Sequence, residues 1–339
     1  MYDLSDNAPR IAIIRKASRL LTWGDDVLEG FRQAGANTLM IELRNEAITE
    51  RWEQLRSGKR HFSSQSGMLR IATSLRKFDP HLVLILNFAG IPDSADKQIR
   101  GAVRPGVPVV GWLCDRIEHL PHGNSPSLDG VYYFDSICRK PLLKAYAGTD
   151  ARISYLPLAA CPKRYKSKPI ILATRKPRAV FAGNCTPERM AVFDEFRALK
   201  GEIDLFGPNS KNTRSRGGQL SPDRIAILYQ EYMVSFNLLQ PGNTTQGLNL
   251  RAFEIPCAGG LAIYPDVPDL AKCFNPGIEM VSYGSISELK DTLDLLLRNP
   301  DRIDAITRAG HARALSEHTF FHRAKHILNE YLPILPILS

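Results

Sequence analysis

The sequence predicts an α/β protein made of two doubly wound, Rossmann-like domains. Short apolar runs alternate with amphipathic helices along most of the chain, a pattern typical of parallel sheets covered on both faces. The length of 339 residues exceeds what one ordinary hydrophobic core serves. A stretch rich in Lys, Arg and Pro interrupts the alternation. We therefore predict an N-terminal domain over 1–160, a linker over 161–177, a C-terminal domain over 178–318 and a terminal helical segment over 319–339.

The N-terminal half contains continuous apolar runs of strand length. We expect strands at 10–15, 38–43, 79–88, 106–115, 130–136 and 152–159. A helix is expected at 25–35, because Asp25 and Asp26 stand at its start and Gly35 just after its end, which are helix-capping positions. Further helices are expected within 45–78, at 93–103 and ending at Ala147.

The same alternation restarts after the predicted linker. Strands are expected at 178–184, 203–208, 233–240, within 244–268 and near 280. The first of them ends in a glycine turn, and the helix that follows has Thr186 as its cap and Pro187 in its first turn. Further helices are expected at 222–232, 301–318 and 320–331. In doubly wound folds ligands bind at the carboxyl ends of the strands, so we look for the site there.

The chain carries a formal net charge of +9. This balance favours anionic partners, which include nucleotide phosphates, acidic polymers, membrane surfaces and nucleic acids. Because the charge is spread along the chain, an ordinary basic surface explains it equally well. No run approaches the ~20 apolar residues that a membrane span needs, and the polar start does not resemble a secretory signal.

Several common sites are missing from the sequence. The six cysteines include no C-x-x-C pair, so we expect reduced, buried thiols and a cytoplasmic location rather than zinc or a disulfide framework. No G-x-G-x-x-G follows the first strand, and no G-x-x-x-x-G-K-[ST], G-x-S-x-G or H-E-x-x-H occurs. These absences argue against a dinucleotide dehydrogenase, a P-loop enzyme, a serine hydrolase and a zinc protease. We expect no metal site and no cofactor.

The segment 244–268 is the most informative for function. It predicts a loop, a helix, a small-residue turn and a buried strand. Arg251 and Glu254 stand three residues apart near the helix start, which places both on one face. A helix N-terminus with a cation suits a phosphate, and a carboxylate accepts hydrogen bonds from ribose or sugar hydroxyls. The turn at Gly183 and Asn184 offers backbone N–H groups to a diphosphate, although a plain strand–helix connection explains it equally well.

Four elements of the C-terminal half form a family pattern. They are an N-x-R-x-F-E signature, a cysteine–small–glycine turn, F-x-P-G and a closing H-T-x-x-x-R. In this chain they are Asn249, Arg251, Phe253 and Glu254; Cys257, Gly259 and Gly260; Phe274, Pro276 and Gly277; and His318, Thr319 and Arg323. With the upstream FAGNCTPER, these elements make residues 178–330 resemble the C-terminal half of GT-B glycosyltransferases. They are most similar to the CgeB-like branch, which is related to family 4 transferases.

The resemblance implies a GT-B fold, with two Rossmann-like domains facing across a cleft and a terminal helix that packs back on the N-terminal domain. It implies sugar transfer from a nucleotide-diphosphate sugar, a UDP-sugar being our first choice, without a catalytic metal. The donor-binding residues carried over are Gly183, Asn184, Gln246, Gly247, Asn249, Arg251 and Glu254. Glu254 would bond the ribose or the donor sugar, while Arg251 and the turn at Gly183 would meet the diphosphate.

One position departs from the family pattern. Related enzymes carry a second glutamate eight positions before Glu254, where this chain has Gln246. Glutamine bonds a hydroxyl but carries no charge, so the sequence leaves the stereochemistry of transfer open. An inverting reaction needs a general base, for which Asp115 at the end of an apolar strand is our first choice, although capping of the next turn explains that residue equally well. Asp115 and Glu254 are therefore the catalytic candidates, and His318 is interpreted as a structural residue.

A second hypothesis belongs to a different class. Gln246, the basic loop 211–216 and the net charge also fit a non-catalytic sugar-nucleotide or polyanion-binding protein on the same scaffold. A nucleic-acid glycosyltransferase and a GT-B-type sugar epimerase are further alternatives. The acceptor is not identified by the sequence; an anionic polymer, a lipid-linked glycan and nucleic acid all suit the charge.

Overall fold

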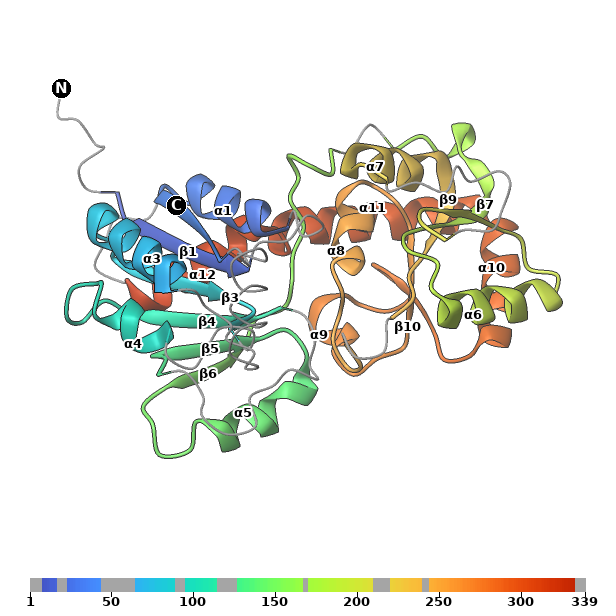
Figure 1. Ribbon diagram of the computed structural model, residues 1–339. Coiled ribbons are helices and arrows are strands. Elements are labelled where there is room, and N and C mark those ends of the chain that lie inside the picture. The colour runs from blue at the N-terminus through green and yellow to red at the C-terminus, as the bar shows by residue number, and fades with distance from the viewer. Residues whose placement is uncertain are drawn as a thin grey trace, which may run out of the picture. The chain divides into compact units, whose positions relative to one another are not determined.

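The computed structural model describes residues 8–16, 23–43, 65–88, 95–114, 127–166, 170–209, 220–239 and 244–332. The chain separates into two compact units. The first unit contains residues 1–156 and 320–339, and the second contains residues 157–319. Each unit has its own parallel sheet with helices packed beside it (Figure 1).

The described strands of the first unit form a six-stranded parallel sheet in the order β2-β1-β3-β4-β5-β6. They are β1 (Arg10–Lys16), β2 (Asn37–Leu43), β3 (Leu82–Leu86), β4 (Val109–Leu113), β5 (Gly130–Tyr133) and β6 (Arg152–Tyr155). Every residue of β3 and β4 is buried, as expected for strands covered on both faces. The strand order reverses between β1 and β3, so the carboxyl ends of these two strands form the topological switch point of this unit.

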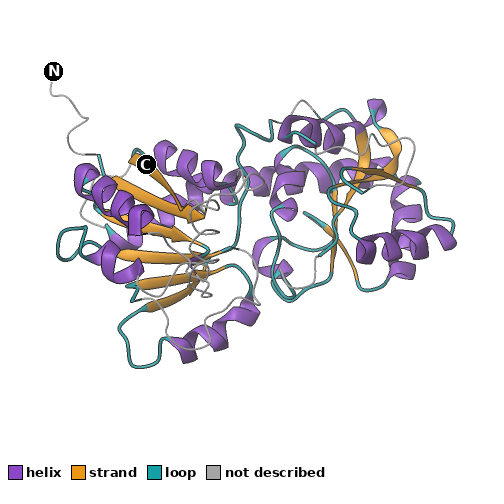
Figure 2. Ribbon diagram, in the orientation of Figure 1, coloured by secondary structure: helices purple, strands orange, loops and turns teal. Residues whose placement is uncertain are grey.

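Helices cover both faces of the first sheet (Figure 2). They are α1 (Trp23–Gln33), α3 (Gln65–Phe78), α4 (Ala95–Arg100), α5 (Arg139–Ala145) and α12 (Phe320–Tyr331). Alternate residues of β4 face opposite sides, as the period of a strand requires. Val109 and Leu113 join one apolar core with side chains of α3, α4 and α5. Trp112 lies edge-on to Phe320 of α12, with ring centroids 6.3 Å apart.

The terminal helix α12 is part of the first unit. Its Glu330 accepts a hydrogen bond from the buried Tyr132 hydroxyl, and burial, reinforced by this bond, raises the pKa of Tyr132. Gly130 lies so close to Tyr331 that an added Cβ would overlap the phenol oxygen. The first unit therefore completes its core with residues that are distant in the sequence.

The described strands of the second unit form a five-stranded parallel sheet in the order β11-β10-β9-β7-β8. They are β7 (Lys176–Ala182), β8 (Ile203–Phe206), β9 (Tyr232–Phe236), β10 (Ala262–Pro265) and β11 (Val281–Tyr283). If the strands of each unit are numbered from one, both sheets have the strand order 2-1-3-4-5, and the first sheet adds a sixth strand after the fifth. The switch point of the second unit lies between β7 and β9.

The helices of the second unit also lie on both faces of its sheet. They are α6 (Pro187–Ala198), α7 (Pro222–Glu231), α8 (Arg251–Cys257), α9 (Leu270–Cys273), α10 (Ile286–Leu297) and α11 (Pro300–Glu317). Phe181 of β7 and Phe236 of β9 join an apolar core with side chains of α6 and α10. The opposite face packs against α7 and α8. The doubly wound α/β class predicted from the sequence is confirmed in both units.

The segment 161–177, which the sequence suggests is a linker, lies within the second unit. Cys161 and Tyr165 are buried, and β7 begins at Lys176. The segment is rich in basic residues, which suggest a linker, but its residues 161–165 form a hydrogen-bonded turn whose first and last side chains are buried. Amino-acid composition alone does not predict such a turn.

Candidate functional site

The carboxyl ends of β7 and β9 meet at the switch point of the second unit. Gly183 and Asn184 follow β7, and Asn237 and Leu238 follow β9. Arg189 of α6 spans the two strand ends, because Nη1 donates to the Asn184 carbonyl at 3.0 Å and Nη2 to the Leu238 carbonyl at 3.2 Å. In doubly wound folds this is the place where ligands bind.

A second arginine reaches the same strand end from α8. The Nε of Arg251 donates to the Ala182 carbonyl at 3.0 Å. Its guanidinium carbon lies 5.7 Å from the centroid of the Phe181 ring, and that of Arg189 lies 5.5 Å from the same centroid. Gly183 makes this approach possible, since a Cβ added there would lie 2.4 Å from Nη2 of Arg251. The sequence predicts both Gly183 and Arg251 at the donor site, and the structure brings them into contact.

These two arginines have no ion-pair partner in the part of the chain that the structure describes. Arg189 is 6% exposed. Burial, and next the charge of Arg251, lower the pKa of Arg189 to about 10, so the group stays charged at neutral pH. Two guanidinium groups in this setting suit an anion with several oxygens, such as a diphosphate.

Glu254 lies one helical turn after Arg251 on α8 and is partly buried. Its Oε1 accepts a hydrogen bond of 2.7 Å from the Tyr165 hydroxyl. The predicted spacing of a cation and a carboxylate on one helical face is therefore present, next to the end of β7.

Several of the backbone N–H groups expected to meet the anion have other partners. In α8 the N–H of Ala252 donates to the Asn249 carbonyl, and the N–H of Glu254 to the Leu250 carbonyl. The N–H of Gly183 donates to the Phe206 carbonyl of β8. The guanidinium groups of Arg189 and Arg251 supply formal positive charge at this site, and the Gly183 N–H is already bonded to β8.

Asn249 holds the loop before α8 against β9. Its side-chain amide forms two hydrogen bonds with the buried Asn237 amide, of 2.7 and 3.0 Å. Its backbone N–H donates to the Tyr264 hydroxyl at 2.9 Å. The same loop is fastened by the carbonyl of Gln246, which accepts from the Asp269 N–H, and by that of Gly247, which accepts from Tyr264. Asn249, which the sequence predicts for donor binding, therefore holds the loop before α8 in place through its bonds to Asn237 and Tyr264.

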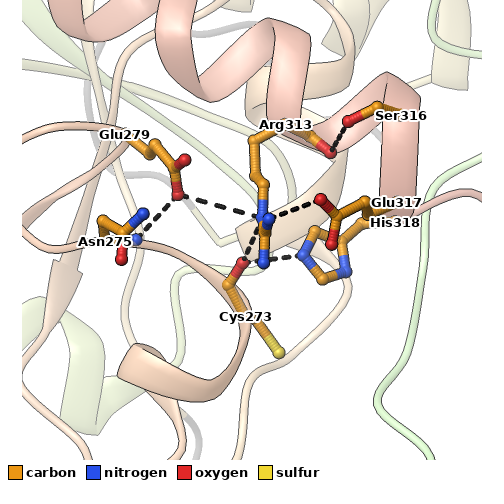
Figure 3. Close-up of polar contacts among 7 residues, drawn as sticks. All are labelled: Cys273, Asn275, Glu279, Arg313, Ser316, Glu317 and His318. Carbon is orange, nitrogen blue, oxygen red and sulfur yellow. Dashed lines mark hydrogen bonds and ion pairs between the residues drawn. The ribbon is translucent and has the colours of Figure 1, made fainter.

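Residues of the F-x-P-G element and of the closing H-T element pack against α8. Figure 3 shows the polar contacts beside them, in which Arg313 and His318 meet the Cys273 carbonyl. The His318 ring lies between Phe253 of α8 and Phe274, with centroids 5.5 and 5.0 Å away. Its Nε2 lies 2.7 Å from the Cys273 carbonyl oxygen. Arg313 of α11 donates to the same carbonyl at 3.2 Å. These contacts agree with the structural role predicted for His318.

Only some of the residues that the sequence predicts for this site are among those that the structure brings together. Asp115, the predicted general base, and the basic loop 211–216 lie outside the described residues. Arg189 and Tyr165 are not predicted. A cation in the first turn of the helix after the glycine turn is the signal that could have pointed to Arg189. No sequence pattern around Tyr165 predicts its contact with Glu254, which lies 89 positions away.

Comparison with known proteins agrees with this geometry. Residues 189–329 match the glycosyl transferase-like family. No curated protein matches the sequence. The sucrose-phosphate synthase of Thermosynechococcus elongatus is similar over 96% of this chain and 99% of its own, with a TM-score of 0.64 and 12% identity. Anabaena HepE in complex with UDP is similar over 96% and 100%, with a TM-score of 0.63 and 11% identity. The lipopolysaccharide outer core galactosyltransferase WaaB, in its apo form, is similar over 94% and 98%, with a TM-score of 0.62 and 13% identity.

The chain therefore has the GT-B fold that the sequence predicts. Its C-terminal region is glycosyl transferase-like, and the matched residues include Arg189, Asn249, Arg251 and Glu254. This match supports the predicted glycosyltransferase class. Within the described residues, no group of three His, Cys, Asp or Glu side chains could hold a metal ion. No helix in the described part of the chain is long and apolar enough to cross a membrane.

Proposed function

We propose that the chain is a glycosyltransferase that uses a nucleotide-diphosphate sugar, with a UDP-sugar as the favoured donor, and needs no catalytic metal. The pair of guanidinium groups at the end of β7 carries this proposal. Arg189 and Arg251 bond backbone carbonyls and form no ion pair among the described residues, so their charge suits a diphosphate. The structure of HepE with UDP supports a uridine nucleotide, in which the base is uracil.

In the proposed reaction the bond between the anomeric carbon and the diphosphate oxygen breaks, and that carbon bonds an acceptor oxygen. The electron pair of the broken bond stays on the diphosphate, whose growing negative charge Arg189 and Arg251 stabilise. The acceptor hydroxyl gives up its proton as the new bond forms. If the reaction inverts configuration, that proton goes to a general base, for which Asp115 is our prediction. Glu254 accepts hydrogen bonds from ribose or sugar hydroxyls and so orients the donor.

Within this class we place the chain in the CgeB-like branch. The support is the way its signature residues converge, since Asn249 ties the loop to β9 while Arg251 and Glu254 extend from α8. For the acceptor, the net charge of +9 favours an anionic polymer, a lipid-linked glycan or nucleic acid. The cytoplasmic location stays a prediction, and the six cysteines are buried thiols.

The decisive variant is Glu254→Ala. We expect its affinity for UDP, measured by calorimetry, to fall by about 10- to 100-fold, because a charged acceptor of ligand hydroxyls is lost. The melting temperature should fall modestly, because the buried Tyr165 hydroxyl loses this acceptor. Glu231→Ala is the matched control, because it removes a carboxylate of the same unit that pairs with Lys176 and Arg224.

Three results separate the hypotheses. Unchanged UDP affinity in Glu254→Ala would refute the site assignment. Donor binding without hydrolysis or transfer, together with polyanion affinity that falls steeply as salt is added, would favour the non-catalytic binding protein. Sugar transfer or slow donor hydrolysis by the wild type, lost in the variant, would support the enzyme.

A further inference from the structure

The residue that bonds Glu254 comes from a part of the chain far from α8 in sequence. Tyr165 is 6% exposed, and its hydroxyl donates to Oε1 of Glu254 at 2.7 Å across 89 positions. The proposed reaction does not yet use this phenol. A buried hydroxyl aimed at the carboxylate that meets the donor needs an explanation beyond packing.

The backbone around Tyr165 is fixed by several contacts. The N–H of Tyr165 donates to the Cys161 carbonyl at 2.9 Å, which closes a turn. The thiol of Cys257, at the end of α8, lies 3.8 Å from the Tyr165 carbonyl oxygen. The side chain of Gln230 on α7 donates to the Lys166 carbonyl at 2.7 Å. The phenol therefore extends from a turn that is held to α7 and α8 and does not depend on the ligand for its place.

A neutral phenol is well suited to orient a carboxylate without cancelling its charge. A carboxylate has two oxygens with about four acceptor positions, and the bond from Tyr165 occupies one of those at Oε1. An arginine or lysine in the same place would form an ion pair and compete with the ligand. The hydrogen bond also restricts the rotation of the Glu254 side chain, which lowers the entropy lost when a ligand binds.

We propose that Tyr165 is a positioning residue for Glu254: its hydroxyl holds the carboxylate in the orientation that accepts bonds from the ribose hydroxyls, and it thereby sets the preference for ribonucleotide over deoxyribonucleotide donors. This inference rests on the proposed function, because it assigns the ribose to Glu254. The turn 161–165, which belongs neither to the strand ends nor to the helices of the site, would then help to determine which nucleotide binds.

The test measures the affinities of UDP and 2′,3′-dideoxy-UDP by calorimetry in four forms of the full chain: wild type, Tyr165→Phe, Glu254→Ala and the double variant. We expect the wild type to prefer UDP by about 10-fold or more, because its carboxylate bonds the hydroxyls. Tyr165→Phe should reduce this preference by about 3- to 10-fold while the affinity for the dideoxy compound changes little. The double variant should match Glu254→Ala.

Tyr232→Phe is the matched control. Tyr232 is also buried in the second unit, and its hydroxyl donates to the Asp204 carboxylate at 2.7 Å, away from α8. It should keep the full preference for UDP. The melting temperatures of Tyr165→Phe and Tyr232→Phe show whether each variant is folded.

The possible failures are distinguishable. A wild type that binds neither compound, or a Glu254→Ala variant that keeps the preference, overturns the proposed function and this inference with it. A wild type that prefers UDP and a Tyr165→Phe variant with the same preference overturn only the inference. Equal weakening of both compounds in Tyr165→Phe also overturns it, because that result shows a structural role alone.

Discussion

The two units share one strand order, yet the cations beside their switch points differ in their partners. Near the carboxyl end of β1, Arg15 forms ion pairs with Asp25 at 3.1 Å and Glu42 at 2.6 Å. At the end of β7, Arg189 and Arg251 bond backbone carbonyls and have no carboxylate partner among the described residues. A paired cation stabilises its own unit, whereas a cation bonded to neutral carbonyls keeps its charge for a ligand. This difference supports our proposal that the second switch point binds the anion.

The strands next to the switch points show a second contrast. Asn87 follows β3 and Asn237 follows β9, which are equivalent positions in the two units. The side chain of Asn87 accepts one bond from the Cys114 N–H at 2.8 Å. That of Asn237 pairs with Asn249 in the loop that leads to α8. Asparagine thus bonds the end of a neighbouring strand in the first unit and the loop that leads to α8 in the second.

The largest expected effect comes from exchanging the arginines for an uncharged side chain of similar length. Arg251→Met should weaken UDP binding by about 100-fold, since charge-assisted bonds to phosphate are lost. Arg15→Met should leave UDP binding unchanged and lower the free energy of unfolding by about 1 kcal/mol, because its ion pairs are partly exposed. Calorimetry and denaturant unfolding of both variants measure these quantities. Equal loss of UDP affinity in the two variants would contradict the proposal that only the switch point of the second unit binds the nucleotide.

A smaller effect is expected when the contact between Gly183 and Arg251 is disturbed. In Gly183→Ala the new methyl group would lie 2.4 Å from Nη2 of Arg251, so the guanidinium must move while the strand stays in place. We expect UDP affinity to fall by about 10-fold, which is less than the loss on removing the charge. Gly284→Ala in the same unit is the control, since its methyl group would meet only the flexible end of Glu288, at 3.2 Å. If Gly183→Ala binds UDP normally, the position of Arg251 does not control the site.

The smallest effect on binding is expected from the two asparagines. Asn237→Ala leaves the Asn249 amide short of partners, so the free energy of unfolding should fall by about 1–3 kcal/mol and UDP affinity by about 3-fold. Asn87→Ala should lower stability by about 1 kcal/mol, because it loses one hydrogen bond and places alanine at a φ of 51°. UDP affinity should not change in Asn87→Ala. A titration and a thermal melt of each variant test the pair, and loss of binding in Asn87→Ala would contradict the assignment.

Much of the fold is predictable because strands covered on both faces read as continuous apolar runs. The range expected around β3 contains the observed strand, and the range expected around β9 begins one residue later than the observed strand. The terminal helix begins and ends at Phe320 and Tyr331 as predicted. Local spacing also predicts that Arg251 and Glu254 lie on one helix and share a face, and both lie on α8.

The rest of the site depends on contacts between distant parts of the chain. Arg189 bonds a carbonyl 49 positions away and Tyr165 a carboxylate 89 positions away, and no local pattern encodes either contact. The first turn of α8 differs from the prediction for a local reason. Leu250 already has helical dihedral angles, φ −52° and ψ −38°, so its carbonyl accepts the N–H groups of the following turn that we expected to meet a ligand.

The place of α12 in the first unit also determines the order in which the protein can be completed during synthesis. Residues 320–332 follow the whole of the second unit in the chain, yet they cover Trp112 and Tyr132 of the first sheet. As the chain leaves the ribosome, the second unit can finish its core while one face of the first sheet still awaits its helix. The first unit can therefore complete its core only after the segment 320–332 has been made.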